Sequence, residues 1–504
     1  MNNPAHNAHS RTVVVVGAGP VGCLAAIALA HRGWLVQLYE GRSDMRLPTS
    51  KAASQQRSIN LAISSRGILA LQAISPSTAQ RLLQSVIPMK GRMIHHINGK
   101  QESQLYDKDG QCINSIDRAL LNEELLQEAA STKNIRILFD HKVQNVDFEK
   151  KIIGARNVRT GEDVSSEFDL IIGADGSYSV VRRQMMRVVR MDYQQEYIRD
   201  EYKELKMQPG RDKDGNPTFL IDPNHLHIWP RHSFMLIALP NQDKTFTCTL
   251  FAPSAEFDHL QTPETILAWF KLNFPDALSL IGEDTLVKDF QRNPRCPLIC
   301  TKSRPYHYKD CAILLGDAAH SMVPFYGQGL NCGLEDVRVL DALFHEEGVS
   351  STEPPAYPSI NGSDEKLHRV LDRYSENRHE DLIAICDLAM DNYAEMRHSV
   401  VTPMYTLKKT LDTFFYKLSA RQPISLTALG PYLSRTPFPP GEPTGWIPLY
   451  TMVTFRPDIS YATARTKAAY QSRILTYVGW IGTTIFALGG AYLAAFLMQS
   501  ARSW

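Results

Sequence analysis

The N-terminal part of the chain alternates short apolar runs with glycine-rich and polar turns. Residues 12–16 (TVVVV) form a β-branched run typical of a strand, and the alanine-rich stretch that ends at Ala30 is typical of a helix. The motif GAGPVG (17–22) lies between them, and a second apolar run, 34–39, leads directly to Glu40. This order predicts a β-α-β unit with a glycine turn after its first strand and an acidic residue after its second.

Two later segments also end an apolar strand at an acidic residue and a glycine. They are 169–179 (DLIIGADGSYS) and 311–333 (CAILLGDAAHSMVPFYGQGLNCG), and the second continues into a helix. Ordinary strand-to-turn junctions would read the same way, but both occur in one chain with GAGPVG, which favours a nucleotide-binding fold. Alternating strands are predicted over 219–251, after a hairpin turn at 212–216 (DKDGN).

The C-terminal part carries a long apolar run. Residues 474–498 contain no charged side chain, and as a helix they would extend about 37 Å, more than the roughly 30 Å hydrocarbon core of a bilayer. A buried core helix is the alternative, although such helices rarely lack a polar stripe over this length. Aromatic residues towards both ends and basic residues before the run favour a transmembrane anchor with the preceding domain in the cytosol. They are Tyr477, Trp480, Tyr492, Arg465, Lys467 and Arg473.

Composition narrows the class of protein. The 504 residues have a net charge of +1, which provides no field to hold a nucleic acid, so nucleic-acid binding is set aside. The cysteines are scattered, as is typical of reduced thiols in a cytosolic environment. The histidine pairs lack a third ligand at suitable spacing, so no metal site is predicted. Residues 1–11 lack the apolar core of a secretory signal and are predicted to be a flexible tail, and 346–365 a flexible insert.

Each glycine of GAGPVG has a task in nucleotide binding. Gly17 permits the tight turn, Gly19 lets a pyrophosphate approach the backbone, and Gly22 lets the helix pack close to the strand. The helix N-terminus then faces the phosphates. Glu40 lies where a carboxylate can accept hydrogen bonds from the ribose hydroxyls of an adenosine. The motif also arises by chance in glycine-rich turns, but the flanking strands and the acid favour a dinucleotide fold.

The three glycine-containing motifs together carry a resemblance to a known family. GAGPVG, GADGS (173–177) and GDAAHSMVPFYGQGLN (316–331) resemble the single-component FAD-dependent aromatic hydroxylases over most of the chain. Longer runs narrow the resemblance to the branch of that family that hydroxylates L-kynurenine: RSINLAIS, PMKGRMIH, LHIWPRHSFMLIALPN, DNYAEMR and IPLYTMVTF.

The resemblance implies an α/β fold. A Rossmann-like FAD-binding domain would comprise 12–185 and 290–345, with an inserted β-sheet substrate domain at 186–289. A helical region, 366–473, would cap the active site, and the transmembrane helix at 474–498 would follow.

The resemblance also implies which residues contact FAD. Asp317 would bind the ribityl chain, and backbone N–H groups near Gly329, Leu330 and Asn331 would stabilise negative charge on the reduced isoalloxazine ring. Arg118 would reach the flavin phosphates or the ribityl chain. The other expected contacts lie in the matched motifs or, for Val143, against adenine: Gly17, Gly19, Val21, Gly22, Tyr39, Glu40, Gly41, Arg42, Ala62, Val143 and Asp175.

The implied reaction is a hydroxylation. NADPH reduces FAD, O2 gives a flavin C4a-hydroperoxide, and one oxygen atom is added to L-kynurenine beside its aniline amine. The product would be 3-hydroxykynurenine, within tryptophan degradation and NAD synthesis. The chain has no second GxGxxG motif, so NADPH is expected to bind transiently. The motifs do not decide whether the reductant is NADPH or NADH. The aniline amine already activates the ring, so no strong general base is expected, and the strands in 219–251 are expected to keep water out.

An amino-acid substrate requires a pocket that can bind its carboxylate. A buried carboxylate needs a cation, and Arg92 is expected to bind it, with Tyr106 donating a second hydrogen bond. Residue type alone would favour a surface arginine at 92. The other expected substrate contacts are Asn392, Tyr450, Phe325 and Glu395. Phe325 can equally be core packing, and Glu395, one helical turn after Asn392, can equally be a structural carboxylate.

Two rival functions stay open. One is a related hydroxylase or epoxidase with a lipophilic substrate taken from the bilayer, against which Arg92 argues, since such a substrate has no carboxylate. The other is a membrane-anchored flavoprotein scaffold without turnover. The resemblance implies the mitochondrial outer membrane as the location, with the catalytic domain facing the cytosol, and leaves the oligomeric state open.

Overall fold

The computed structural model describes residues 10–50, 60–107, 109–352, 364–419, 426–439, 441 and 443–477, with only the backbone of 426–429. Most of the predicted tail (1–11), insert (346–365) and membrane anchor (474–498) therefore lies outside the described residues. Among the residues that are described, no helix combines the length and the apolar character needed to cross a bilayer.

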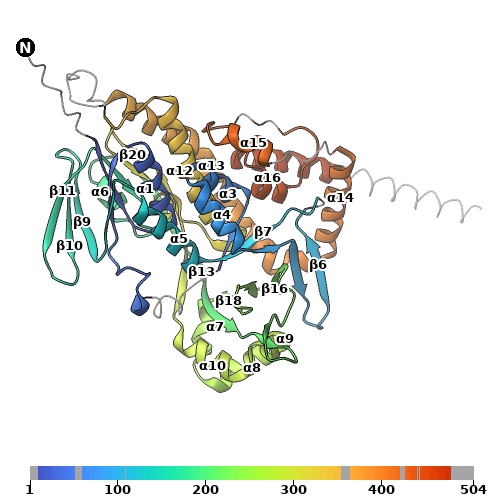
Figure 1. The fold of residues 1–504 in the computed structure, drawn as a ribbon. Coiled ribbons are helices and arrows are strands. Elements are labelled where there is room, and N and C mark those ends of the chain that lie inside the picture. Colours follow the sequence, from blue (N-terminus) through green and yellow to red (C-terminus); the bar gives the residue numbers. More distant parts are fainter. Residues whose placement is uncertain are drawn as a thin grey trace, which may run out of the picture.

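A six-stranded sheet forms the centre of the nucleotide-binding half of the fold (Figure 1). Its order is β20-β21-β12-β1-β2-β8, and every neighbouring pair except β20–β21 is parallel. The bounds are β1 (Thr12–Val16), β2 (Leu35–Tyr39), β8 (Ile135–Leu138), β12 (Leu170–Gly173), β20 (His307–Tyr308) and β21 (Ala312–Leu314). The predicted β-α-β unit is confirmed, because α1 (Pro20–His31) connects β1 to β2. The carboxyl ends of β1, β2, β12 and β21 meet at one edge, where α/β sheets bind their ligands.

Helices and two smaller sheets surround this sheet. The first small sheet, β11-β10-β9, lies at one end of the molecule in Figure 1, and the second, β3-β7-β4, leads towards the seven-stranded sheet described next. The helices are α3 (Ser65–Ile74), α4 (Pro76–Gln84), α5 (Arg118–Ser131), α6 (Val180–Met185), α11 (Asp317–His320), η1 (Pro324–Tyr326) and α12 (Gly329–Glu346). The strands are β3 (Asn60–Ile63), β4 (Ile87–Met89), β7 (Ile113–Asp117), β9 (His141–Asp147), β10 (Ile152–Asn157) and β11 (Asp163–Glu167).

A seven-stranded sheet forms the second layer, in the order β19-β13-β18-β17-β16-β5-β6. Its strands are β5 (Gly91–His95), β6 (Gln101–Leu105), β13 (Asp192–Met207), β16 (His225–Arg231), β17 (Phe234–Pro240), β18 (Phe246–Pro253) and β19 (Arg295–Arg304). The strands predicted within 219–251 are confirmed. The sheet nevertheless extends beyond the boundaries 186–289 expected for it, because β5 pairs in parallel with β16 and β19 pairs with β13. A short hairpin, β14 (Gly210–Arg211) and β15 (Pro217–Thr218), contains the predicted turn.

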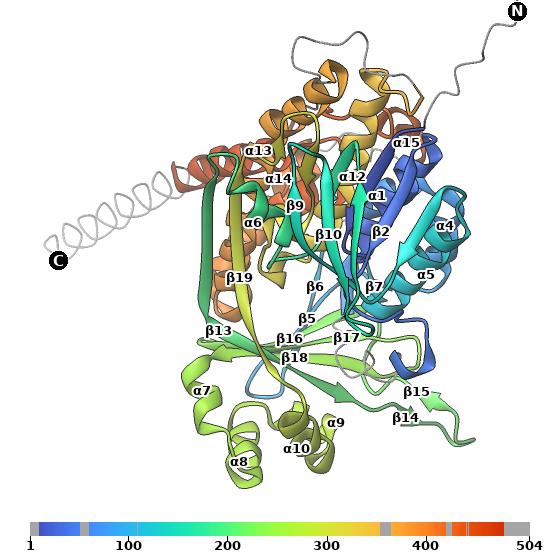
Figure 2. The same ribbon diagram turned by 90° about the vertical axis from the view of Figure 1, so that its left-hand side faces the viewer.

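The alternation of side chains along β17 shows how this sheet divides two cores. Leu236 and Ala238 belong to a core shared with the helices on one face. Those helices are α7 (Ser254–His259), α8 (Pro263–Asn273), α9 (Pro275–Ile281) and α10 (Glu283–Arg292), seen below the sheet in Figure 2. Met235, Ile237 and Leu239 point to the other face and pack against the nucleotide-binding half. That second face therefore forms one wall of the interior between the two halves.

Helices complete the C-terminal region. They are α13 (Glu365–Arg397), η2 (Ser399–Val401), α14 (Pro403–Ser419), α15 (Leu426–Leu433) and α16 (Leu449–Phe455), and residues 461–477 are also helical. Helix α13 contacts α12, β19 and η1. It thus brings residues near 392 beside the loop that precedes α12.

Candidate active site

The glycine turn after β1 is tightly packed on one side and open on the other. Gly17 has a φ of +101°, and a Cβ atom there would lie 2.4 Å from the carbonyl oxygen of Ala174. A Cβ atom on Gly22 would lie 1.9 Å from the carbonyl oxygen of Gly17, so the helix and the turn can approach only without a side chain. A Cβ atom on Gly19 would meet nothing within 4 Å. The turn therefore presents its backbone to open space at Gly19, where the sequence predicts a pyrophosphate.

Glu40 is held beside this turn by backbone and side-chain donors. Its carboxylate accepts hydrogen bonds from the Ala18 N–H at 3.0 Å and from the Arg42 N–H and Nε at 3.0 and 2.9 Å. Burial acts to raise the pKa of Glu40, but Arg42 and the backbone N–H groups outweigh it and lower the pKa. The Arg42 side chain is 79% exposed, so it can move away when ribose hydroxyls compete for the carboxylate.

Three other expected nucleotide contacts lie along the same edge. The hydroxyl of Tyr39 is hydrogen-bonded to Gln37 and Ser166 and is buried among neighbouring strands. Gly41 lies against Lys142, and the side chain of Val143 is buried in the hydrophobic core. The side chains of Tyr39 and Val143 are therefore buried, and Gly41 has no side chain between its backbone and a ligand.

Asp317 lies within electrostatic range of Arg118. Asp317 is exposed between the buried residues Gly316 and Ala318, yet desolvation raises its pKa, while Arg118 acts to lower it. An exposed but poorly hydrated carboxylate is typical of a group that faces an interior space. Asp175 lies beside Gly17, and its Oδ2 atom caps α6 by accepting from the Val180 N–H at 2.6 Å.

The segment before α12 is clamped to β3 by Asn331. Its Oδ1 atom accepts from the Ser64 N–H at 2.8 Å, and its Nδ2 atom donates to the carbonyls of Ala62 at 2.8 Å and Gly327 at 2.7 Å. Within the described chain no side chain caps the N-terminus of α12, so the N–H groups near Gly329 and Leu330 are available to an anionic ring edge.

Val21 connects the glycine turn to this second region. A Cβ atom on Gly333 would lie 2.7 Å from its Cγ2 atom, and one on Gly316 would lie 3.2 Å from the same atom. The two motifs, more than 290 residues apart in the sequence, are therefore in direct contact.

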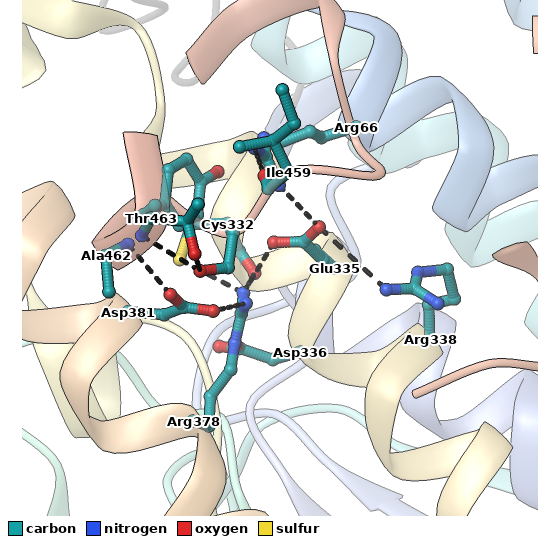
Figure 3. A network of polar contacts seen from close by, with 12 residues as sticks. Arg66, Cys332, Glu335, Asp336, Arg338, Arg378, Asp381, Ile459, Ala462 and Thr463 are labelled. Carbon is teal, nitrogen blue, oxygen red and sulfur yellow. Dashed lines mark hydrogen bonds and ion pairs between the residues drawn. The ribbon is translucent and has the colours of Figure 1, made fainter. Parts of the chain in front are cut away.

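A buried ionic network lies behind this region (Figure 3). Glu335 of α12 accepts from Arg378 at 2.8 Å and from Arg66 at 3.0 Å. Arg66 also donates to the carbonyl of Ile459, and Asp381 accepts from the Ala462 N–H at 2.9 Å. Helices α3, α12 and α13 and the chain after α16 are thus joined by charged groups that are excluded from water.

Asp336 connects this network to the turn at Gly316. It accepts from Arg378 at 3.1 Å, from the Gly316 N–H at 3.1 Å and from His320 at 2.5 Å. Gly316 immediately precedes Asp317, so Asp336 fixes the turn that presents the Asp317 carboxylate. The ligand atoms of His320, Cys332 and Asp336 lie within 4.8 Å of one another, but Arg378 already supplies the positive charge there.

Arg92 of β5 is the centre of a second group of expected residues. It is 6% exposed and donates to Glu395 at 3.1 Å and to Asn392 at 3.4 Å. Its Nε atom and the hydroxyl of Tyr106 are both buried without a hydrogen-bond partner among the described residues. Burial acts to lower the pKa of Arg92, but Tyr405 and Glu395 outweigh it and raise the pKa. Buried donors without partners are costly, so this cluster is suited to a bound acceptor such as a carboxylate.

Asn392 links this cluster to the segment before α12. Its Nδ2 atom donates to the carbonyl of Phe325 at 2.6 Å while its Oδ1 atom accepts from Arg92. One residue, Asn392, therefore connects Arg92 to residues 324–328 before α12, a segment that we call the flavin loop.

Aromatic rings wall the space between them. Tyr450 stacks on Tyr106 with ring centroids 4.8 Å apart and on Tyr326 at 5.7 Å. Phe325 stacks on Tyr393 at 3.9 Å. Leu226, Ile237 and Leu239 of the seven-stranded sheet pack in the same cluster as Tyr106 and Tyr450. The expected residues Arg92, Tyr106, Asn392, Glu395, Tyr450 and Phe325 are thus brought together.

Sequence reasoning missed residues of α14 that lie at this site. The hydroxyl of Tyr405 donates to Glu395 at 3.2 Å, and Lys409 lies within electrostatic range of Arg92. Their spacing of four residues places them on one helical face, and that spacing is the one signal available in the sequence.

The residues along this edge of the sheet fit FAD. The turn is open at Gly19, the Asp175 Oδ1 atom is buried without a partner among the residues described, and Asp317 is an exposed carboxylate whose pKa is raised by desolvation. These groups lie at the carboxyl ends of parallel strands, where phosphates, ribose and a ribityl chain find backbone donors and carboxylates.

Comparisons with known proteins agree with this geometry. A family model described as an FAD binding domain matches residues 10–346. A kynurenine 3-monooxygenase of Cryptococcus neoformans var. neoformans serotype D (strain B-3501A) is 44% identical over 513 residues, covering 98% of each chain. One of Saccharomyces cerevisiae is 41% identical over 500 residues, covering 97% of this chain and 99% of the relative.

Solved structures share the fold at lower identity. A tetrameric 2-methyl-3-hydroxypyridine-5-carboxylic acid oxygenase aligns with a TM-score of 0.58 at 20% identity, covering 79% of this chain and 95% of that one. PqsL, a probable FAD-dependent monooxygenase of Pseudomonas aeruginosa, also aligns with a TM-score of 0.58, at 16% identity, covering 77% and 97%.

Proposed function

The chain belongs to the kynurenine 3-monooxygenase family, and we propose that Arg92 receives the carboxylate of L-kynurenine in its active site. The protein is an FAD-dependent monooxygenase that hydroxylates kynurenine, with NADPH as co-substrate. When bound, FAD would accept the hydride of NADPH and, once reduced, activate O2. The residues of the chain bind and orient the substrate and keep water out.

The observation that carries the assignment of the substrate site is the pair of unpartnered buried donors, Arg92 Nε and the Tyr106 hydroxyl. A substrate carboxylate would accept from both, and Glu395 lies where it can pair with the ammonium group of the same amino acid. A bidentate, charge-assisted contact of this kind orients a ligand as well as binding it. The lipophilic substrate of the rival hydroxylase would leave these donors unpaired.

The distal part of the substrate would lie against Phe325, Tyr326 and the apolar face of the sheet. Asn392 donates to the Phe325 carbonyl, so the head-group cluster and the flavin loop hold a fixed separation. Burial of these rings excludes water from the reacting carbon. The aniline amine of kynurenine donates electrons to the ring carbon beside it, so the pocket has no need of a strong base before oxygen transfer.

The roles proposed for the cofactor residues follow from the same geometry. Asp317 would bind the ribityl chain with Arg118 beside it, Glu40 the adenosine ribose, and the N–H groups near Gly329 and Leu330 the pyrimidine edge of the flavin. NADPH would bind transiently, because the sequence has one GxGxxG motif.

We also propose that residues 474–498 anchor the enzyme in the mitochondrial outer membrane with the catalytic domain in the cytosol. The support is the sequence alone: an uncharged run long enough to cross a bilayer, preceded by basic residues.

The test of function is NADPH consumption by the purified protein with and without L-kynurenine, together with mass detection of one added oxygen atom. Kynurenine should stimulate NADPH oxidation and gain the oxygen. Tight FAD with no kynurenine-dependent oxidation would instead support a scaffold, and hydroxylation of a lipophilic substrate alone would support the rival hydroxylase.

A further inference from the structure

Helix α14 contributes one face to the head-group cluster. Tyr405 donates to Glu395 at 3.2 Å, which fixes that face of the helix against the Arg92–Glu395 pair. Lys409 follows Tyr405 by one helical turn and lies on the same face. Three groups on three other elements lie within electrostatic range of its ammonium: Arg92 of β5, Glu395 of α13 and Glu102 of β6.

Lys409 has no partner that accounts for its charge. It is half-buried and makes neither a hydrogen bond nor an ion pair with another residue in the described part of the chain. Glu395 is already bonded to Arg92 and Tyr405, and Glu102 accepts from Gln104. Neither carboxylate is bonded to Lys409 in the described part of the chain, so its ammonium can pair with an anion that binds beside Arg92, where the substrate carboxylate is proposed to lie. A partly desolvated ammonium without a partner is unfavourable until an anion arrives.

We propose that Lys409 is a second cation for the substrate's α-carboxylate, acting with Arg92 to select amino-acid substrates over amines. This inference rests on the proposed function of the same site. It makes Lys409 a specificity-determining residue contributed by α14, so that the head group is held between β5 on one side and the C-terminal helices on the other.

The charge on Lys409 gives the site a pH dependence. Desolvation and Arg92 lower the pKa of Lys409 to about 8, against the opposing effect of Glu395 and Glu102. Arg92 and Tyr405 have raised pKa values, so both keep their protons at that pH. Lys409 is therefore charged below about pH 8 and neutral above it, and affinity for the carboxylate should fall as the pH rises through that value.

The test compares Lys409→Met and Lys409→Arg in the full-length holoenzyme, with Lys408→Met, an exposed neighbour on α14, as the matched control. Steady-state KM and kcat are measured for L-kynurenine and for its decarboxylated amine at pH 7. Lys409→Met should raise KM for kynurenine by about 10- to 100-fold, the range of one charge-assisted hydrogen bond, with kcat within about twofold. KM for the amine should stay unchanged or fall, because a cation is removed beside a cationic ligand. Lys408→Met should match the wild type.

A pH series supplies the second readout. The rise of KM through about pH 8 should disappear in Lys409→Met and move to higher pH in Lys409→Arg, whose guanidinium stays charged. Titration of the substrate amine affects all variants equally. The proposal is overturned if Lys409→Met has the same KM for kynurenine as the wild type. It is also overturned if KM rises equally for kynurenine and for the amine. If Lys409→Met loses FAD, the Lys409→Arg pH series decides alone. A wild-type enzyme that does not respond to kynurenine would overturn the proposed function instead.

Discussion

Replacement of Arg92 by methionine is the sharpest test of the substrate site. Methionine keeps most of the side-chain volume on β5 but removes the charge and all five donors. Arg92 is 6% exposed and bonded to Glu395 and Asn392, so the variant would leave the incoming carboxylate beside Glu395 with no adjacent guanidinium.

The expected loss follows from the surroundings of the pair. Stranding one partner of a buried ion pair costs about 3–5 kcal/mol, and about 1.4 kcal/mol corresponds to a factor of ten. The side chain of Glu395 is 38% exposed, so water reaches part of the cluster and the lower end of that range applies. We expect the Kd for L-kynurenine to rise on the order of 100-fold, with a smaller change in kcat because the flavin loop is untouched.

The assay is kynurenine titration of the FAD-loaded variant, followed by the flavin absorbance change, with the decarboxylated amine as the comparison ligand. The amine should bind the variant no worse than it binds the wild type. Arg397→Met, which removes a partly exposed cation on α13 near Asp200, is the matched control and should leave the Kd for kynurenine within about twofold. Unchanged kynurenine affinity in Arg92→Met, with FAD retained, would refute the assignment of the head-group site.

Three further predictions concern the cofactor, the ionic network and the tail. Asp317→Ala should purify largely without FAD, as flavin absorbance would report, and full loading would count against a ribityl contact. Glu335→Gln should lower the free energy of unfolding by about 3–5 kcal/mol at pH 7, because three buried arginines lose a shared partner. Although burial opposes it, Arg378, Arg66 and Arg338 lower the pKa of Glu335 to about 2. Its stabilising effect is complete above a carboxyl group's usual pKa of about 4.5 and is lost as the pH falls towards 2, so denaturant midpoints of the two proteins should converge below about pH 4.5; a constant gap would contradict this. A chain truncated before Ile474 should leave the membrane fraction, and continued sedimentation with membranes would contradict the anchor.

Local patterns made much of the nucleotide-binding half predictable. The β-branched run, the glycine turn and the terminal acid of the first unit are determined by neighbours within about thirty residues, so periodicity and turn chemistry suffice. The same holds for the strands of 219–251, whose alternation reflects one face packed on α7–α10 and the other on the nucleotide-binding half.

The order of strands in the second sheet could not be read in this way. The parallel pairing of β5 with β16 joins Arg92 to Leu226, and nothing in either strand encodes that distant partner. For this reason the expected boundary at 186–289 excluded β5, β6 and β19, which complete the sheet. Motif resemblance could identify Arg92, but it could not show that Asn392 connects it to the Phe325 carbonyl.

The buried ionic network shows most clearly what local sequence patterns cannot predict. Charged residues spaced along a helix ordinarily indicate a solvent-facing side, and the run GLEDVR of α12 has that pattern. In the fold Glu335 and Asp336 are instead buried, because Arg66 and Arg378 from other helices form ion pairs with them, and Arg338 is buried beside Glu335. Burial of such groups is tolerable only when every partner is present. The position of Asp317 therefore depends, through Asp336 and Arg378, on residues far from it in the sequence, and no local pattern can specify it.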